Sequence, residues 1–392
     1  MKLVWLLLFL IIVSGAWLLG YRSRPRDEEP RKRSLPRDYL MGLNFLLNDE
    51  TDKAVDIFIK MLEVDSETVE THLAVGKLFR RRGEVDRAIR IHQNLIARPQ
   101  LERHYREQSL YELGQDYLSA GVLDRAERIF HELVNEKSHS AQALRTLLDI
   151  YQQEKDWGKA IDIAIKYESV TKQSMRAVIA HYYCELGEAA YLKSDYDEAI
   201  PHLDKAVATD PNCVRVSLLL AKVYMSKGDY KTALKSLKKI KDQNPDYLSE
   251  AIDLLASCYE NLKQEDELVV YLKNLVDEYP RVPVVLILAE RIRQWKGDKT
   301  AVSFVADYVR RYPSLRGLYL FINLYISTAE GRAKEDLHIL QKLMKKIIAD
   351  KPDYQCTSCG FSGKTLHWQC PGCRQWSTIL PVYSMEESPA KA

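Results

Sequence analysis

Four of the seven cysteines in this 392-residue chain fall near its C-terminus as two Cys-x-x-Cys pairs, separated by ten residues. The first pair is Cys356 and Cys359, and the second is Cys370 and Cys373. Two residues between thiols let a tight turn present both sulfurs to one metal ion, and two such turns complete a tetrahedral set of four sulfurs. The spacing therefore predicts a metal site with these four ligands. The alternative chemistry for such pairs is a dithiol redox reaction.

The segment that carries these cysteines, residues 351–381, is too short to fold on apolar burial alone. Domains of this size are commonly stabilised by a bound metal ion. We expect its aromatic residues to supply most of its core, and we expect His367 to pack or lie on the surface because four thiolates need no fifth ligand. Since no coordination position is left open, the site reads as structural or redox-responsive. The aromatic residues are Tyr354, Phe361, Trp368 and Trp376.

The two cysteine turns, Cys356-Thr-Ser-Cys359-Gly and Cys370-Pro-Gly-Cys373, resemble the metal-binding loops of rubredoxin. The resemblance implies iron as the cofactor. Four thiolates accept zinc equally well. Nucleic-acid binding by a zinc ribbon is disfavoured, because Lys364 and Arg374 are the only Lys or Arg residues between Pro352 and Pro381.

The composition of the whole chain indicates long helices and no general electrostatic attraction. Glycine and proline together make up 30 of the 392 residues, which is low for a protein rich in strands and loops. The net charge is only +2, so no overall basic field gathers nucleic acid. Recognition by charge must therefore be local.

A repeated frame organises the chain before the cysteine segment: a small residue, an aromatic or apolar residue three later, and alanine twelve later. This frame resembles the tetratricopeptide repeat, in which the small residue and the alanine mark the close crossing of helix A and helix B. We predict an all-α superhelix over residues 38–350, with degenerate last units, followed by a rubredoxin-like domain at 351–381. The clearest copies are Gly42/Phe45/Ala54, Gly76/Phe79/Ala88, Gly114/Tyr117/Ala126, Leu148/Tyr151/Ala160, Gly187/Ala190/Ala199 and Ala221/Tyr224/Ala233.

A stacked array of this kind presents its A helices as a binding surface. Lys77, Arg80 and Arg81 lie at helical spacing in the second unit and could receive an acidic peptide, with a solvated face as the alternative. We interpret the remaining cysteines, Cys184, Cys213 and Cys258, as packed structural thiols. The array shows no phosphate loop, nucleophile elbow or His-Glu metal helix, so we expect no enzyme.

The first residues carry the membrane signal. Leu3–Leu19 is free of charge and can just span a bilayer, so residues 1–21 are predicted to form a transmembrane anchor. A cleaved secretory signal is the alternative. Because basic residues follow the apolar run in a tether at 22–37, the positive-inside rule places the rest of the chain in the cytoplasm. A flexible tail is expected at 382–392.

The order of anchor, basic tether, helical array and four-cysteine domain resembles the lipopolysaccharide assembly protein B family of Gram-negative bacteria over essentially the whole chain. This resemblance implies a single-pass inner-membrane adaptor that faces the cytoplasm and regulates lipopolysaccharide synthesis. It further implies that the protein promotes proteolysis of the lipid A-committing deacetylase by a membrane AAA+ metalloprotease and responds to a membrane-embedded regulator. It also implies that the metal ligands are Cys356, Cys359, Cys370 and Cys373. An electron-transfer protein, with an iron site docked on a helical scaffold, is the alternative.

Overall fold

The computed structural model describes residues 37–48, 50, 53, 54, 57, 69–136 and 139–382. The predicted anchor at 1–21 lies outside these residues, as do the tether at 22–37 apart from Arg37 and the tail at 382–392 apart from Val382. Within the described part of the chain, no helix combines the length and the apolar character needed to cross a membrane.

The chain forms two compact units, the first ending at Val122 and the second beginning at Leu123. Among its described residues, the first unit has the helices α2 (Arg37–Leu47), α4 (Val69–Arg81), α5 (Val85–Ile96) and α6 (Arg103–Ser119). The second unit contains α7 (Leu123–Asn135), α8 (Ser140–Glu154), α9 (Trp157–Thr171), α10 (Arg176–Leu192), α11 (Tyr196–Thr209), α12 (Val214–Ser226), α13 (Tyr230–Lys238), α14 (Ile240–Gln243), η2 (Pro245–Tyr247), α15 (Leu248–Asn261), α16 (Glu265–Glu278), α17 (Val282–Lys296), α18 (Asp298–Arg311), α19 (Leu315–Tyr325) and α20 (Gly331–Asp350).

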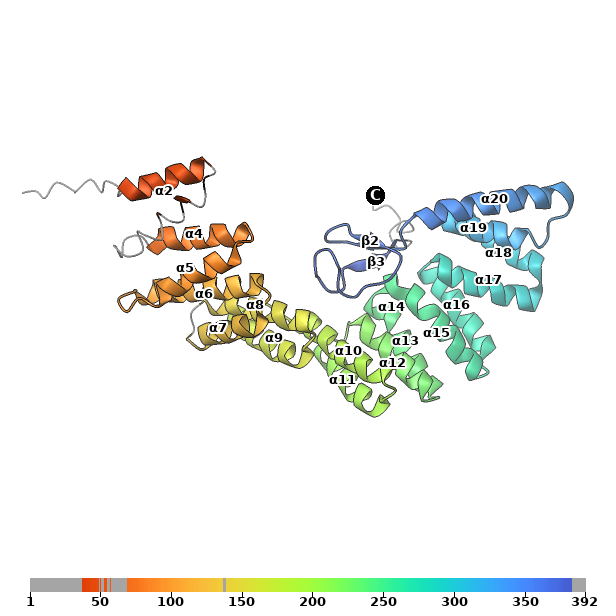
Figure 1. Ribbon diagram of the computed structural model, residues 1–392. Helices are drawn as coiled ribbons and strands as arrows, with labels where there is room; N and C mark the ends of the chain where they lie inside the picture. Colours follow the sequence, from red (N-terminus) through yellow and green to blue (C-terminus); the bar gives the residue numbers. More distant parts are fainter. Residues whose placement is uncertain are drawn as a thin grey trace, which may run out of the picture. The chain divides into compact units, whose positions relative to one another are not determined.

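Within the units, successive helices pack as antiparallel pairs where the repeat frame predicts them, as α4 does with α5, α8 with α9 and α10 with α11 (Figure 1). The small residue of helix A receives the large residue that stands four places after the alanine of helix B. A Cβ atom on Gly76 would clash with the His92 ring, and one on Gly187 would lie 2.7 Å from Leu203. The frame alanines are fully buried: Ala54, Ala88, Ala126, Ala160, Ala199, Ala233 and Ala301.

Glycine and aspartate end one helix and begin the next within a pair. Gly228, between α12 and α13, has a φ of 78°, a left-handed conformation that side-chain-bearing residues avoid. The carboxylate of the following residue, Asp229, accepts a hydrogen bond from the backbone N–H of Thr232 and so caps α13. The chain therefore reverses direction in very few residues.

The A helices α6 and α10 each run for 17 residues, whereas α4 and α12 each run for 13. These longer helices account for the wider spacing of the repeat frame before Gly114 and Gly187. The extra turn lengthens the surface that α10 offers to its neighbours.

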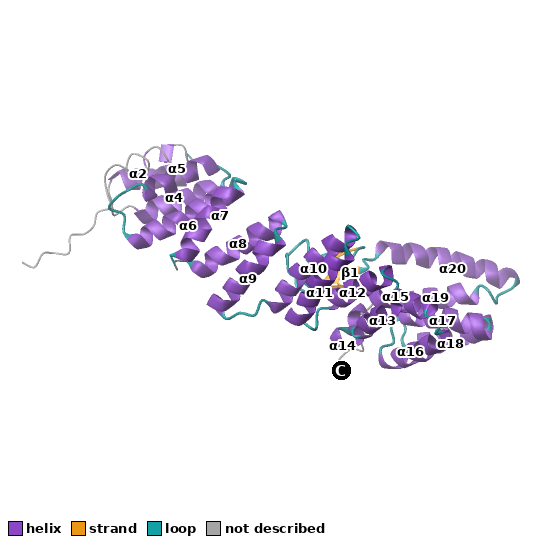
Figure 2. Cartoon of the chain, turned by 90° about the horizontal axis from the view of Figure 1, so that it is seen from below, coloured by secondary structure: helices purple, strands orange, loops and turns teal. Residues whose placement is uncertain are grey.

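The C-terminal segment forms a small three-stranded antiparallel sheet in the order β2-β1-β3. Tyr354 in the central strand pairs with Gly363 on one side and with Pro381 on the other. Figure 2 shows that, in the part of the chain that the structure describes, strands are confined to this segment, which we call the ribbon (residues 351–382). Its strands are β1 (Tyr354–Cys356), β2 (Ser362–Gly363) and β3 (Ile379–Pro381).

Candidate metal centre

The ribbon brings the four C-terminal cysteines together. Their Sγ atoms all lie within 4.8 Å of one another. The distance from Cys356 Sγ to Cys373 Sγ is 3.8 Å, and that from Cys359 Sγ to Cys370 Sγ is 3.6 Å. Four sulfurs bound tetrahedrally at a metal–sulfur distance of about 2.3 Å would stand about 3.8 Å apart. The donor set therefore fits a metal ion.

Two equivalent turns place the thiols. The backbone N–H of Gly360 donates to the carbonyl of Cys356 at 3.0 Å, and the N–H of Arg374 donates to the carbonyl of Cys370 at 2.8 Å. Gly360 and Arg374, each directly after the second cysteine of its pair, both have positive φ angles, 77° and 57°. A side chain is strained in this conformation, so glycine suits the first turn, and Arg374 adopts it despite its Cβ.

The surroundings shift the pKa values of two of these thiols in opposite directions. Burial would raise the pKa of Cys356, but its hydrogen bond with the Thr378 hydroxyl and those from the N–H groups of Cys359 and Ser358 outweigh it and lower the pKa to about 6. The N–H of Phe361 acts to lower the pKa of Cys359, yet burial and the neighbouring thiols raise that pKa to about 11. Four thiolates therefore require a positive charge among them.

The ribbon packs on the second unit through a tryptophan that follows the last cysteine. Trp376 stacks on His181 of α10, with ring centroids 4.9 Å apart and planes at 22°. It meets Tyr182 and Trp157 edge-on, at 5.9 Å and 6.2 Å. The hydroxyl of Ser377 lies 2.6 Å from Nε2 of His181. Burial lowers the pKa of His181 to about 3, with Arg215 adding to the effect, so the imidazole is neutral in this stack.

A second aromatic contact lies beside the first. Trp368 stacks on Tyr247 of η2 at 5.3 Å, and the Tyr247 hydroxyl donates to the carbonyl of Ile379 at 2.9 Å. Buried aromatic surface and a buried hydrogen bond therefore both hold the ribbon against η2.

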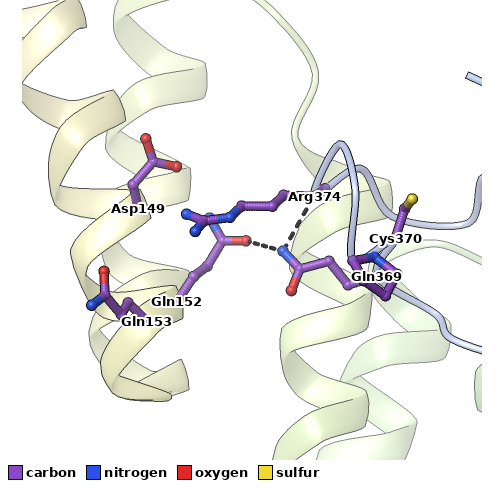
Figure 3. Close-up of a pocket in the computed structure, with 7 residues that line it drawn as sticks. Asp149, Gln152, Gln153, Gln369, Cys370 and Arg374 are labelled. Atoms are coloured by element: carbon purple, nitrogen blue, oxygen red, sulfur yellow. Dashed lines mark hydrogen bonds between the residues drawn. The ribbon is translucent and has the colours of Figure 1, made fainter. Parts of the chain in front are cut away.

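Polar contacts surround the aromatic ones. The side-chain amide of Gln369 donates to Gln152 of α8 at 2.9 Å, as Figure 3 shows, and the indole N–H of Trp376 donates to the same oxygen at 3.3 Å. Arg316 of α19 pairs with Asp353 at 2.6 Å. The Tyr354 hydroxyl donates to Glu250 of α15 at 2.9 Å. The ribbon is therefore held by several A helices of the second unit.

These contacts correct one prediction about the ribbon. Tyr354, Phe361 and Leu366 do pack around Cys356 and Cys370 inside it. Trp368 and Trp376, which were expected to complete that core, lie instead against the helices of the array. The reason is that the thiols and a few apolar residues already fill so small a core. His367 is exposed, with Nε2 3.0 Å from the Thr365 hydroxyl.

Two pockets flank the ribbon where it meets α8. One, of about 270 Å³, is lined by Asp149, Gln152, Cys370 and Arg374, among others, and Figure 3 shows Arg374 reaching toward the helix. The other, of about 440 Å³, lies between α8, α10 and the segment 374–378. Burial raises the pKa of Asp149, which lines both pockets, while Arg145 and Arg374 act in the opposite direction.

The basic residues predicted to receive an acidic peptide lie on α4 in the first unit. Arg80 contacts Glu112 and Asp116 of α6, both at 2.7 Å, and Lys77 contacts Glu112 at 2.9 Å. Two of the three cations therefore already have acidic partners within the chain, whereas Arg81 is exposed. Binding of an outside peptide by these residues stays a prediction.

Comparison with known proteins gives the same two modules. Models of the tetratricopeptide repeat match residues 71–104, 190–258 and 250–281, and a model of the rubredoxin metal binding domain matches residues 354–381. Lipopolysaccharide assembly protein B of Escherichia coli strain K12 is 40% identical over 384 residues, which cover 97% of this chain and 99% of the relative. The chain belongs to the lipopolysaccharide assembly protein B family. The protein of that name from Haemophilus influenzae is 38% identical over 395 residues, with the same coverage of each chain.

The resemblance of this lipopolysaccharide assembly protein B family member to tetratricopeptide and rubredoxin modules is thus confirmed. Among solved structures, a crystal structure of MamA is 22% identical over 44% of this chain and 90% of its own, with a TM-score of 0.30.

The sequence indicates a core or groove role for His181 and Tyr182, and both are buried, but it does not predict that they hold the ribbon. It gives no such role to the other residues of the array that contact the ribbon, which are Gln152, Trp157 and Tyr247. The aromatic run at 181–183 and the lone Trp157 were the available signals, since large rings at the start of repeats need a partner. Their partner, Trp376, lies about 200 residues later in the sequence, so no local pattern predicts the contact.

Proposed function

We propose that this protein is a non-enzymatic inner-membrane adaptor that regulates lipopolysaccharide synthesis. In this proposal it brings the lipid A-committing deacetylase to a membrane AAA+ metalloprotease and answers to a membrane-embedded regulator. The observation that carries the proposal is the full-length relationship to lipopolysaccharide assembly protein B, joined to an array of repeats that serves binding. The anchor at 1–21 keeps the adaptor in the plane of its partners and raises their effective concentration.

In this account the four cysteines hold one iron ion, and zinc would satisfy the same donors. The bound ion supplies the charge and the cross-link that let the ribbon fold. The ribbon's own side chains then do the positioning: Trp376 and Trp368 lie on the rings of α10 and η2, and Gln369 bonds to α8. The four cysteines therefore affect client binding only indirectly. By holding the ribbon folded, they determine the shape of the surface that the ribbon forms with the array.

We assign the client segment to the pocket of about 440 Å³ beside the ribbon. Its wall carries the guanidinium groups of Arg145 and Arg374 with the single carboxylate of Asp149, next to the ring of Trp376. A chain segment with one acidic and one apolar side chain complements this wall. The size of the pocket suits one or two residues of such a segment.

The test replaces the native copy in cells by Arg374→Glu and follows the half-life of the deacetylase. The proposal predicts a longer half-life and a higher deacetylase level, while Arg332→Glu, an exposed arginine of α20, leaves both unchanged. An unchanged half-life with Arg374→Glu would contradict the assignment of the client segment to this pocket. Deletion of residues 1–21 should abolish regulation, and a pull-down from membranes with the intact anchor should recover protease and deacetylase together.

A further inference from the structure

A second group of soft donor atoms lies inside the array, away from the ribbon cysteines. His181 and Cys184 stand three residues apart on α10, and Cys213 directly precedes α12. One imidazole nitrogen and the two Sγ atoms all lie within 4.8 Å of one another. Residues three apart on a helix share a face, so α10 presents both of its donors to the start of α12.

The three side chains are buried in apolar surroundings. His181 is 1% exposed, Cys184 is fully buried and Cys213 is 5% exposed. The two cysteines belong to one cluster with Ala180, Val216 and other apolar residues of α10 and α12. Such a shell excludes competing water from the donors.

One ring nitrogen of His181 is left without a hydrogen-bond partner. Nε2 of His181 lies 2.6 Å from the Ser377 hydroxyl, whereas Nδ1 is buried and has no hydrogen-bond partner. A neutral imidazole carries one N–H, and placing it on Nε2 leaves a lone pair on Nδ1. Ligating histidines commonly donate their other N–H to a nearby oxygen, which fixes the ring.

The charged group nearest in sequence to these donors is already paired within the chain. Arg215, two residues after Cys213, is buried and contacts Glu185 at 2.8 Å and Glu188 at 2.5 Å. The two carboxylates balance the charge of the buried guanidinium, which otherwise acts to lower the pKa of His181. Cys258 offers a contrast: it is fully buried on α15, yet among the described residues it joins no such group of donors.

We propose that His181, Cys184 and Cys213 form a second metal site, separate from the four-cysteine centre, that binds one soft d¹⁰ ion. Two thiolates and an imidazole are the donors that Cu(I) and Zn²⁺ share. Cu(I) is satisfied by three donors, whereas Zn²⁺ takes a fourth ligand. The ion holds the His181 ring in the plane that stacks on Trp376 and so ties the junction of α10 and α12 to the ribbon.

The test measures bound metal per full-length chain after anaerobic loading, in one arm with Zn²⁺ and in the other with Cu(I), each against a competing chelator. We expect two equivalents in at least one arm, and the arm that gives them identifies the ion. Cys213→Ala and Cys213→Ser should each lose one equivalent and keep the other. Cys258→Ala, the matched buried control, should keep both.

Two results would overturn the site. One is a single equivalent in both arms with the unaltered protein. The other is two equivalents that persist in Cys213→Ala and Cys213→Ser. Co²⁺ loading gives an independent reading, because loss of a site with two sulfurs and one nitrogen changes the absorption spectrum while the four-sulfur bands remain. Far-UV circular dichroism checks that both variants fold.

Discussion

The two units satisfy the polar and aromatic groups of their A helices in different ways. In the first unit, Arg80 of α4 lies between Glu112 and Asp116 of α6, and Asp116 also meets Nδ1 of His92 at 2.5 Å. In the second unit, rings of α10 and η2 are covered by Trp376 and Trp368 of the ribbon. In the first unit, these side chains are therefore paired with residues of a neighbouring repeat. In the second unit, they are covered by the ribbon, which lies much later in the sequence.

This difference separates two sources of stability. The Arg80 cluster is an arrangement of buried charges, so its stability depends on every member being present. The ribbon contact is mostly aromatic and neutral, so it depends on the ribbon being folded, and hence on the metal centre. Loss of metal should consequently affect the second unit and spare the first.

The largest effect is expected from Cys356→Ser combined with Cys359→Ser. Structural metal sites supply on the order of 10 kcal/mol to small domains, so the ribbon should unfold. Limited proteolysis should then cut within residues 354–381, while far-UV circular dichroism keeps most of its helical signal. Cys258→Ser is the control and should resist cleavage. A double variant as resistant as the control would contradict a metal-dependent ribbon.

Arg80→Ala is the corresponding change in the first unit. It leaves Asp116, which is fully buried, and Glu112 without their guanidinium partner, so we expect a loss of about 3–5 kcal/mol in the stability of that unit. Hydrogen exchange of the amides of α4 and α6 measures it. Arg81→Ala, which removes an exposed neighbour, should change the same free energy by less than about 0.5 kcal/mol. Equal effects of the two variants would show that the cluster is not structural.

Trp376→Ala removes the ring that joins the ribbon to α10 but leaves the four cysteines. Because the side chain is only half-buried, we expect a loss of about 2–3 kcal/mol, at or below the low end for buried tryptophans. Chemical unfolding monitored at the second unit measures the change. Trp295→Ala is the matched control, since that tryptophan of α17 is 66% exposed, and it should have almost no effect. Metal content should stay unchanged in both variants.

The smallest effect concerns a charged contact in the second unit. The hydroxyl of Tyr151 donates to Glu127 at 2.5 Å and lowers the pKa of that carboxyl, with Lys159 assisting. A lowered pKa means that the stabilisation is present above the ordinary glutamate pKa and is lost as the pH falls through the folded value. The difference in melting temperature between the unaltered protein and Glu127→Gln should therefore be constant from pH 7 to 5.5 and vanish in stronger acid. A difference that grows in acid would contradict the assignment.

The sequence predicted the parts of this molecule whose signals are local. Two residues between thiols identify the four-cysteine centre, and an alanine twelve residues after a small residue identifies each helix crossing. His92 stands four residues after Ala88, where other repeats have Phe130 or Leu203, and it fills the same position over Gly76. The longer A helices explain the irregular repeat spacing.

What the sequence could not predict are pairings between distant segments. Arg80 reaches Asp116 across 36 residues, and His181 reaches Ser377 across 196. Nothing in the neighbourhood of Trp376 distinguishes a core residue of the ribbon from one that packs on another element. Both roles require a large apolar ring. Trp376 packs outward because the thiols and the apolar residues Tyr354, Phe361 and Leu366 already fill the interior of the ribbon.

We expect the metal centre to stabilise the A helices of the second unit through the ribbon. Hydrogen–deuterium exchange of the full-length protein, before and after Cys356→Ser with Cys359→Ser, tests it directly. The account predicts faster exchange in α8, α10 and η2 as well as in the ribbon, with α4, α5 and α6 unchanged. Faster exchange confined to residues 354–381, with the helices that contact the ribbon unaffected, would contradict it.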